Sequence, residues 1–134
     1  MSKLWKDSYS LEIIEIDNQH KELFRIFEEL LIAMSKGKGN EIVLKTLNNL
    51  ENYAQMHFGV EEKYMQKFGF EQFQDHFEAH QYFYQKIAEL KKAYQENNLT
   101  VAKELMDFLN KWVGKHICGT DALYKDLFIQ NNVI

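Results

Sequence analysis

The sequence has no proline, six glycines among its 134 residues and a single cysteine, Cys118. Sandwiches and barrels contain many turns, which use proline and glycine, so the scarcity of both disfavours these folds. One cysteine cannot form an internal disulfide, so we expect a reducing compartment, the cytoplasm. We interpret Cys118 as a small buried hydrophobic residue.

The chain also lacks a long apolar run at its start and an excess of positive charge. The opening MSKLWKDSYS has no stretch that could act as a signal or a membrane anchor, so we expect no membrane partner. Scattered charges sum to −4, which argues against a nucleic-acid partner. Hydrophobic residues make up 46% of the chain, enough for the core of a single domain over 1–134. Its polar exterior favours a monomer.

Three short breaks, at 36–40, around 68–70 and at 96–100, are rich in residues that stop or cap helices, with Asn40 as a plausible cap. We predict helices over 17–36, 40–67, 72–95 and 101–118, an N-terminal arm over 1–15 and a short segment after Asp121. Short turns between long amphipathic helices favour antiparallel neighbours. The predicted fold is therefore all-α, an up-down-up-down four-helix bundle.

All the histidines lie on the apolar stripes of these helices. They are His20, His57, His76, His80 and His116. A lone histidine on such a stripe is usually a hydrogen-bonded core residue, but five together need another explanation. In an antiparallel bundle, residues equally far from a shared turn lie at one height. His20 and His57 are equally distant along the chain from the first break, and His80 and His116 are equally distant from Asn98.

Two carboxylates fall at the same height. Glu61 and His76 are almost equally distant along the chain from Gly69, and His76 and Asp121 are almost equally distant from Asn98. Buried imidazoles and carboxylates are costly unless something positive lies among them. Five nitrogen donors and two carboxylates exceed what one tetrahedral zinc takes. Two metal ions bridged by Glu61, Asp121 and a solvent oxygen fit this set, with one position open, and iron suits its chemistry.

Spacing within the helices supports a metal site. His57 and Glu61 are four residues apart, which places them on one helix face, and the same holds for the two histidines of HFEAH. His116 and Asp121 are five apart, so their helix should end or distort near Gly119. Ferritin-like di-iron bundles need Glu-x-x-His, and no histidine here has a glutamate three residues before it.

Four motifs resemble the bacterial hemerythrin family: IDNQHKELF, HFGVEEKYM, HFEAH and WVGKHICGTD. The resemblance extends from about residue 5 to residue 124. In this family dioxygen binds reversibly at a non-heme di-iron centre, at the iron with two histidines. The resemblance implies a set of ligands for each iron. One iron would take His76, His80 and His116, the other His20 and His57, and Glu61 and Asp121 would bridge the pair.

The same resemblance places a dioxygen pocket beside the irons, lined by Phe24, Phe58, Trp112, Val113 and Ile117. An apolar pocket without a general acid favours binding over turnover, and Tyr64 and Tyr124 are the residues that could supply a proton. We expect a dioxygen-binding protein for storage, delivery or scavenging, not an enzyme. The alternatives are a di-iron peroxidase or nitric-oxide-handling enzyme, acting on peroxide or nitric oxide, and an iron- or oxygen-responsive module.

Two positions depart from the family pattern. Glu12 stands where a glycine is common before the IDxQH stretch, and the Tyr-Pro that often precedes the third helix is missing. Both departures concern the arm and a turn, so they leave the implied ligands intact.

Overall fold

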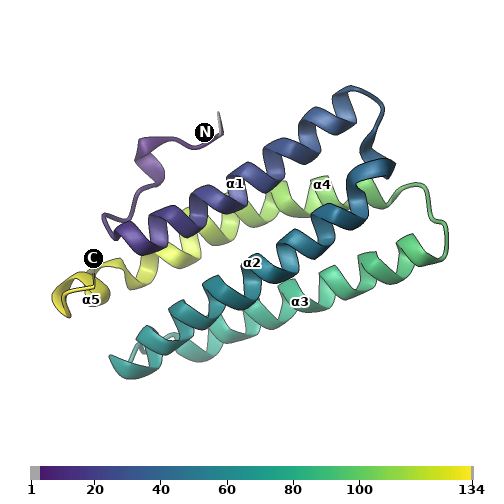
Figure 1. Cartoon of the computed structure of the whole chain (residues 1–134). Coiled ribbons are helices and arrows are strands. Elements are labelled where there is room, and N and C mark those ends of the chain that lie inside the picture. The colour runs from purple at the N-terminus through teal and green to yellow at the C-terminus, as the bar shows by residue number, and fades with distance from the viewer. Residues whose placement is uncertain (1–3, 134) are drawn as a thin grey trace.

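The computed structural model describes residues 4–133, with the side chains of Ile117, Cys118, Thr120 and Asp121 outside the description. Its elements follow in chain order: η1 (Asp7–Tyr9), α1 (Ile14–Ser35), α2 (Gly39–Lys67), α3 (Phe73–Gln95), α4 (Val101–Trp112), η2 (Val113–Thr120), η3 (Asp121–Tyr124) and α5 (Lys125–Gln130). Consecutive long helices run antiparallel, and α1 lies beside both α2 and α4 (Figure 1). The predicted all-α bundle with additions at both ends is confirmed, and no strand occurs among the residues described.

The turns fall at the three predicted breaks. Gly37, with φ 70°, ends α1, and the next amide, of Lys38, donates to the Ala33 carbonyl at 2.7 Å. Gly69 and Asn97 have φ 68° and 64° at the ends of α2 and α3. Glycine and asparagine are the residues that adopt this left-handed conformation most readily, which is why these breaks are recognisable in the sequence.

Helix bounds differ from the predicted ranges at the start of the second helix and at the end of the fourth. Helix α2 begins at Gly39, so Asn40 lies in its first turn and is not its cap. Helix α4 ends at Trp112 and continues as the π-helix η2, Val113–Thr120. The distortion expected near Gly119 is present, and it starts earlier, at Val113, because the whole segment changes its hydrogen-bond pattern. A single domain over 1–134 stays a prediction.

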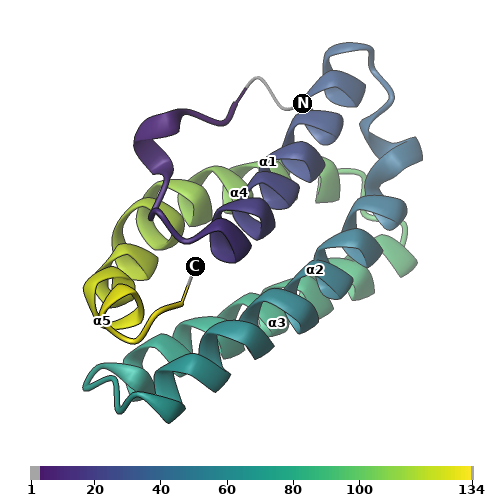
Figure 2. The same ribbon diagram turned by 60° about the vertical axis from the view of Figure 1, so that its left-hand side comes forward.

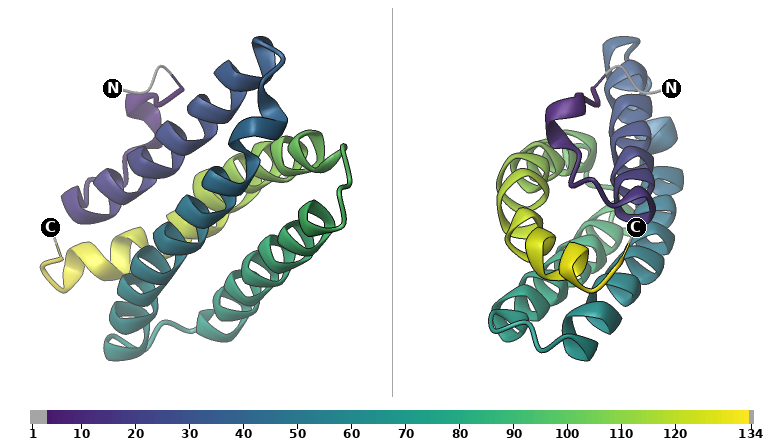
Figure 3. Two further views of the ribbon diagram at one scale, coloured as in Figure 1. Left: turned by 45° about the vertical axis from the view of Figure 1, so that its right-hand side comes forward. Right: turned by 90° about the vertical axis from the view of Figure 1, so that its left-hand side faces the viewer.

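Two clusters of buried apolar side chains fill the bundle. The larger, which includes Leu23 and Phe83, extends toward the turns that follow α1 and α3. The smaller, which includes Ile16, Met65 and Phe128, lies at the opposite end, where α5 packs across the bundle (Figure 3). None of the described helices is long and apolar enough to span a membrane.

The N-terminal arm lies outside the bundle, next to α1 and α4 (Figure 2). The rings of Trp5 and Tyr9 lie 5.6 and 5.4 Å from that of Phe24, the latter pair stacked. The carboxylate of Asp17, in the first turns of α1, accepts a hydrogen bond from the Leu11 amide at 2.8 Å. The arm is therefore held both by aromatic contacts and by a carboxylate.

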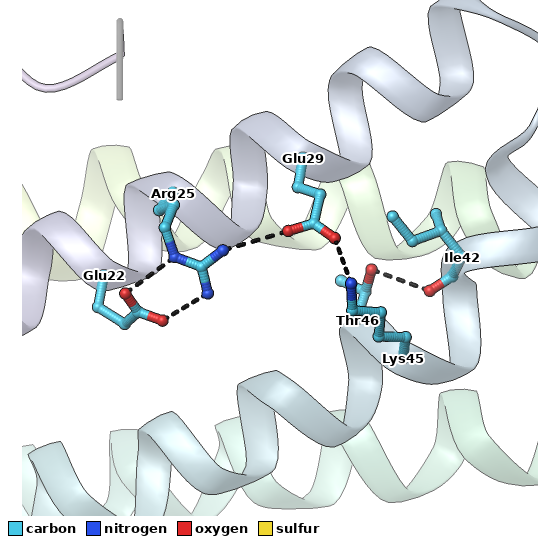
Figure 4. A network of polar contacts seen from close by, with 6 residues as sticks. All are labelled: Glu22, Arg25, Glu29, Ile42, Lys45 and Thr46. Carbon is cyan, nitrogen blue, oxygen red and sulfur yellow. Dashed lines mark hydrogen bonds and ion pairs between the residues drawn. The ribbon is translucent and has the colours of Figure 1, made fainter. Parts of the chain in front are cut away.

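An ion-pair network on the surface joins α1 to α2 (Figure 4). Arg25 donates to Glu22 at 2.6 Å and to Glu29 at 3.2 Å, and Lys45 donates to Glu29 at 3.0 Å. The hydrogen bond to Glu22 is the main cause of the raised pKa of Arg25. Exposed pairs of this kind contribute about 0–1 kcal/mol each, so the apolar clusters, not this network, hold the helices together.

Candidate metal centre

A layer of buried polar side chains separates the two apolar clusters. On α1, His20 lies between Ile16 of the smaller cluster and Leu23 of the larger one. Helices α2 and α3 and the π-helix η2 contribute the rest of the layer. Its members are no more than 3% exposed: His20, His57, Glu61, His76, His80 and His116. The structure thus brings together all the predicted ligands whose side chains it describes.

Glu61 lies in the middle of this layer. Its carboxylate oxygens lie 2.8 Å from Nε2 of His57, 3.3 Å from Nε2 of His76 and 3.4 Å from Nε2 of His80. Four side chains each offer one ligand atom, and these atoms lie within 4.8 Å of one another, a grouping that could hold a metal ion. The four residues are Glu61, His76, His80 and His116.

His20 and His57 form a second group of donors. Their rings lie 4.8 Å apart, and His57 faces Glu61 from one turn earlier on α2. The carboxylate of Glu61 therefore connects a group of three histidines with a group of two. The spacing along the sequence predicts that these side chains lie in one layer, and the family resemblance implies their division into groups of three and two.

Two hydrogen bonds orient histidine rings toward the centre. Nδ1 of His80 donates to Oε2 of Glu62 at 2.7 Å, and Nδ1 of His57 donates to Oε1 of Gln19 at 2.6 Å. Because these oxygens accept, Nδ1 carries the proton and Nε2 of a neutral ring presents its lone pair to the centre.

The donor atoms fit a cation. Nε2 of His80 is buried and has no hydrogen-bond partner among the described residues. Leaving such a nitrogen unpaired is costly, and binding a metal ion would satisfy it. The carboxylate oxygens of Glu61 are surrounded by imidazole nitrogens. Borderline transition metals prefer such a combination of oxygen and nitrogen donors.

Aromatic rings hold the histidines in place. Phe58 stacks on His80 with the ring centroids 3.8 Å apart, and Trp112 stacks on His116 at 4.0 Å. Phe58 also lies 5.9 Å from Trp112, so the two rings form a continuous apolar wall. Such apolar packing lowers the dielectric constant around these two rings and strengthens electrostatic interactions there.

The residues predicted to line a dioxygen pocket are buried where their side chains are described. Phe58, Trp112 and Val113 belong to the larger apolar cluster, and Phe24 joins it beneath the arm. Ile117 lies outside the described side chains. A cleft of about 500 Å³ between α3 and α4 reaches Trp112 and His116 from the surface.

Asp121, the seventh predicted ligand, also has a side chain outside the description, and its backbone begins η3 directly after the π-helix. A π-helix closes its hydrogen bonds between residues five apart, the separation of His116 and Asp121. The change of helix type therefore occurs where this spacing requires one.

Four residues at the centre were not predicted as contacts of the ligands. Gln19 and Glu62 are each adjacent in sequence to a predicted ligand, and only the rotation of a neighbouring helix decides which histidine each one meets. The ring of Tyr53 lies 5.2 Å from His57, four residues later on the same helix, so the spacing could have revealed it. Tyr124, considered as a proton donor, lies 5.6 Å from His76 between ring centroids.

Fold and centre together define a helical bundle with buried histidines and a buried carboxylate that could hold a metal ion. The chain belongs to the hemerythrin family: the hemerythrin HHE cation binding domain matches residues 12–128. The predicted resemblance is therefore confirmed.

Several curated proteins are similar over most of the chain. The bacteriohemerythrin of Clostridium acetobutylicum is 30% identical over 127 residues, which cover 92% of this chain and 98% of the relative. That of Methylococcus capsulatus is 33% identical over 108 residues, covering 81% and 82%. A hemerythrin-like protein of Naegleria gruberi is 30% identical over 121 residues, covering 90% and 89%.

Proposed function

We propose that the chain binds dioxygen reversibly at a non-heme di-iron centre, for oxygen storage, delivery or scavenging. One observation carries the proposal: the buried carboxylate of Glu61 faces histidines of both groups, with oxygens 2.8 Å from His57 and 3.3 Å from His76. A carboxylate so placed is suited to bridging two ions. Asp121 would be the second bridge, and His20, His80 and His116 would complete the ligands.

Imidazole and carboxylate donors suit iron among the redox metals. Bound iron would supply the reversible change of oxidation state that dioxygen binding needs. With three histidines for one ion and two for the other, the second ion would have a coordination position left for a small ligand. That position could also bind nitric oxide or peroxide. A cytoplasmic location and a monomeric state, as expected from the sequence, are part of the proposal.

Apolar surroundings favour binding over turnover. Phe58 and Trp112 cover histidines of the centre, and Val113 extends the same wall. Tyr64 is only partly buried, and its hydroxyl lies 3.4 Å from Glu15, a residue outside the buried polar layer. Cleavage of a bound oxidant is helped by a positioned proton donor, and Tyr64 is poorly placed for that role.

Tyr124 favours a second candidate, a peroxidase-type activity. Its side chain is fully buried, and its ring lies 5.6 Å from that of His76. A phenol at this position could deliver a proton to an oxidant bound at the centre. If the protein is a peroxidase, Tyr124→Phe should slow peroxide turnover by on the order of 10²-fold or more. If it is a dioxygen carrier, reversible binding should survive this change.

Iron content and the visible spectrum test the proposed function. The reduced protein is measured anaerobically, after adding air and after removing it. Two irons with a reversible band support a dioxygen carrier, irreversible oxidation points to an enzyme or a sensor, and absence of iron overturns the site. His57→Ala and Glu61→Ala should lose iron, whereas Lys38→Ala, at an exposed turn, should not. Two irons in both ligand variants would contradict the proposed ligands.

A further inference from the structure

One histidine in each group has a hydrogen-bond partner of a different charge. His80, in the group of three, donates from Nδ1 to the carboxylate of Glu62 at 2.7 Å. His57, in the group of two, donates from Nδ1 to the neutral amide oxygen of Gln19 at 2.6 Å. The two bonds have the same role in orienting a ring, and they differ in the charge that each brings to its histidine.

Glu62 is held in a defined place. It follows Glu61 directly on α2, and consecutive helical residues project about 100° apart, so one carboxylate enters the centre while the other reaches the outer edge of His80. Phe58 stacks on His80 with an interplanar angle of 3°, which restrains rotation of the imidazole. The side chain of Glu62 is 25% exposed, and that of His80 is fully buried. The bond therefore joins a buried donor to a carboxylate at the edge of the core.

A carboxylate that accepts from a metal-bound imidazole makes the ring a stronger electron donor. Its negative charge also stabilises an ion more when the positive charge of that ion rises, which happens when the ion loses an electron. An amide oxygen provides a hydrogen bond without this charge. His80 is fully buried against Phe58, so this difference acts on a ring in surroundings of low dielectric constant.

We propose that Glu62 is a positioning residue that lowers the reduction potential of the iron held by the three-histidine group, so that this iron is oxidised before its neighbour. Gln19 leaves the two-histidine iron, where the small ligand binds, easier to keep reduced. This inference rests on the proposed di-iron centre and adds an order of oxidation to it. The order follows from the two partner residues and not from the number of histidines alone.

The test is Glu62→Gln, which keeps an acceptor oxygen and removes the charge. In a potentiometric titration with redox mediators, the potential of the first oxidation step should rise. Iron affinity should fall by at most on the order of 10–100-fold, the usual effect of changing such a partner. Mössbauer spectra of the half-oxidised protein should assign the ferric ion to the three-histidine site in the wild type, and less exclusively in the variant.

Two further variants make the result decisive. Gln19→Glu places a carboxylate beside His57 and should lower the reduction potential of the second oxidation step. This variant tests the inference if Glu62→Gln fails to retain iron. Glu89→Gln removes an exposed charge from α3 and should leave both potentials unchanged. Unchanged potentials in iron-loaded Glu62→Gln or Gln19→Glu would overturn the inference. A wild-type protein that holds two irons but oxidises irreversibly in air would instead refute the proposed function and leave this inference standing.

Discussion

Glu12 occupies a backbone conformation that glycine adopts more easily. Its φ of 61° is left-handed, and its side chain is 74% exposed, 3.9 Å from Lys125 at the nearest charged atom. For a residue with a β-carbon this conformation costs roughly 1 kcal/mol. The resemblance to the hemerythrin family had already marked this position as one where glycine is common.

We predict that Glu12→Gly raises the free energy of unfolding by up to about 1 kcal/mol, because relief of the left-handed conformation outweighs the extra freedom of glycine in the unfolded chain. Urea titration of both proteins measures the change. Glu12→Ala is the control, since it removes the same side chain but keeps the β-carbon, and it should bring no gain. Equal effects of the two substitutions would assign the change to the lost carboxylate.

Tyr84 provides a prediction about alkaline pH. Burial raises the pKa of its phenol above the usual value, and the nearby charges of Glu62 and Glu51 raise it further. The folded protein therefore holds this proton more tightly than the unfolded chain does. That contribution to stability is complete below the unfolded pKa of about 10 and is lost as the pH rises through the folded value.

Tyr84→Phe keeps the ring, which lies 5.6 Å from Phe58, and removes the titrating group. We expect the wild type to lose more stability than this variant between pH 8 and about pH 11. Urea unfolding at both pH values measures the difference, and the remaining tyrosines are common to both proteins. Parallel losses in the two proteins would show that Tyr84 titrates as in the unfolded chain.

The residues that surround the centre show how far sequence reasoning reaches. The histidines and Glu61 were predictable, because polar side chains interrupt apolar stripes at matching heights in an antiparallel bundle. Gln19 and Glu62 were not, because either side chain could have faced solvent. Their partners depend on how α1, α2 and α3 rotate about their axes, which the apolar stripes define only to within the width of a face.

At the scale of elements, the junction between the arm and α1 depends on one carboxylate. Asp17 accepts hydrogen bonds from the hydroxyl of Ser10 and from the amide of Leu11, so it fixes the chain where the arm meets α1. Beyond this point Trp5 and Tyr9 cover Phe24. Loosening the junction should therefore uncover an aromatic residue of the larger cluster.

We predict that Asp17→Ala lowers the free energy of unfolding by about 1.5–3 kcal/mol, the range for hydrogen bonds to a charged group. Acrylamide quenching of tryptophan fluorescence should increase because Trp5 becomes more accessible. Trp112→Phe, made in both proteins, removes the second tryptophan from the signal. Ser10→Ala is a milder control that removes one of the two bonds. Unchanged quenching in Asp17→Ala would show that the aromatic contacts alone hold the arm.

The turns and the π-helix show how far the sequence predicts individual elements. The turns at Gly37 and Gly69 were evident, because left-handed residues end helices in a recognisable way. The π-helix from Val113 was only partly foreseen. The five-residue separation of His116 and Asp121 requires a departure from α-geometry, but it does not reveal where the departure begins, since no residue type is specific to π-helices.

At the scale of the whole molecule, the polar layer weakens the core unless a metal is bound. Glu61 is fully buried, and removing a carboxylate from water carries a large desolvation cost, which a bound cation would offset. An ion bound only by the folded protein stabilises it by about 2.7 kcal/mol when its concentration is a hundredfold above the dissociation constant. Folding and metal binding should therefore be coupled through Glu61.

Glu61→Gln separates the two contributions, because it keeps the shape of the side chain and removes the buried charge. At pH 8 the metal-free variant should unfold at a temperature equal to or above that of the metal-free wild type, since the desolvation cost of a buried carboxylate has been removed. With iron bound, the wild type should unfold at the higher temperature, because only the wild type gains the full stabilisation from metal binding. Calorimetry with and without a chelator measures all four states, and Glu89→Gln controls for the loss of a charge elsewhere. A variant that gains as much from iron as the wild type would show that Glu61 does not bind the metal.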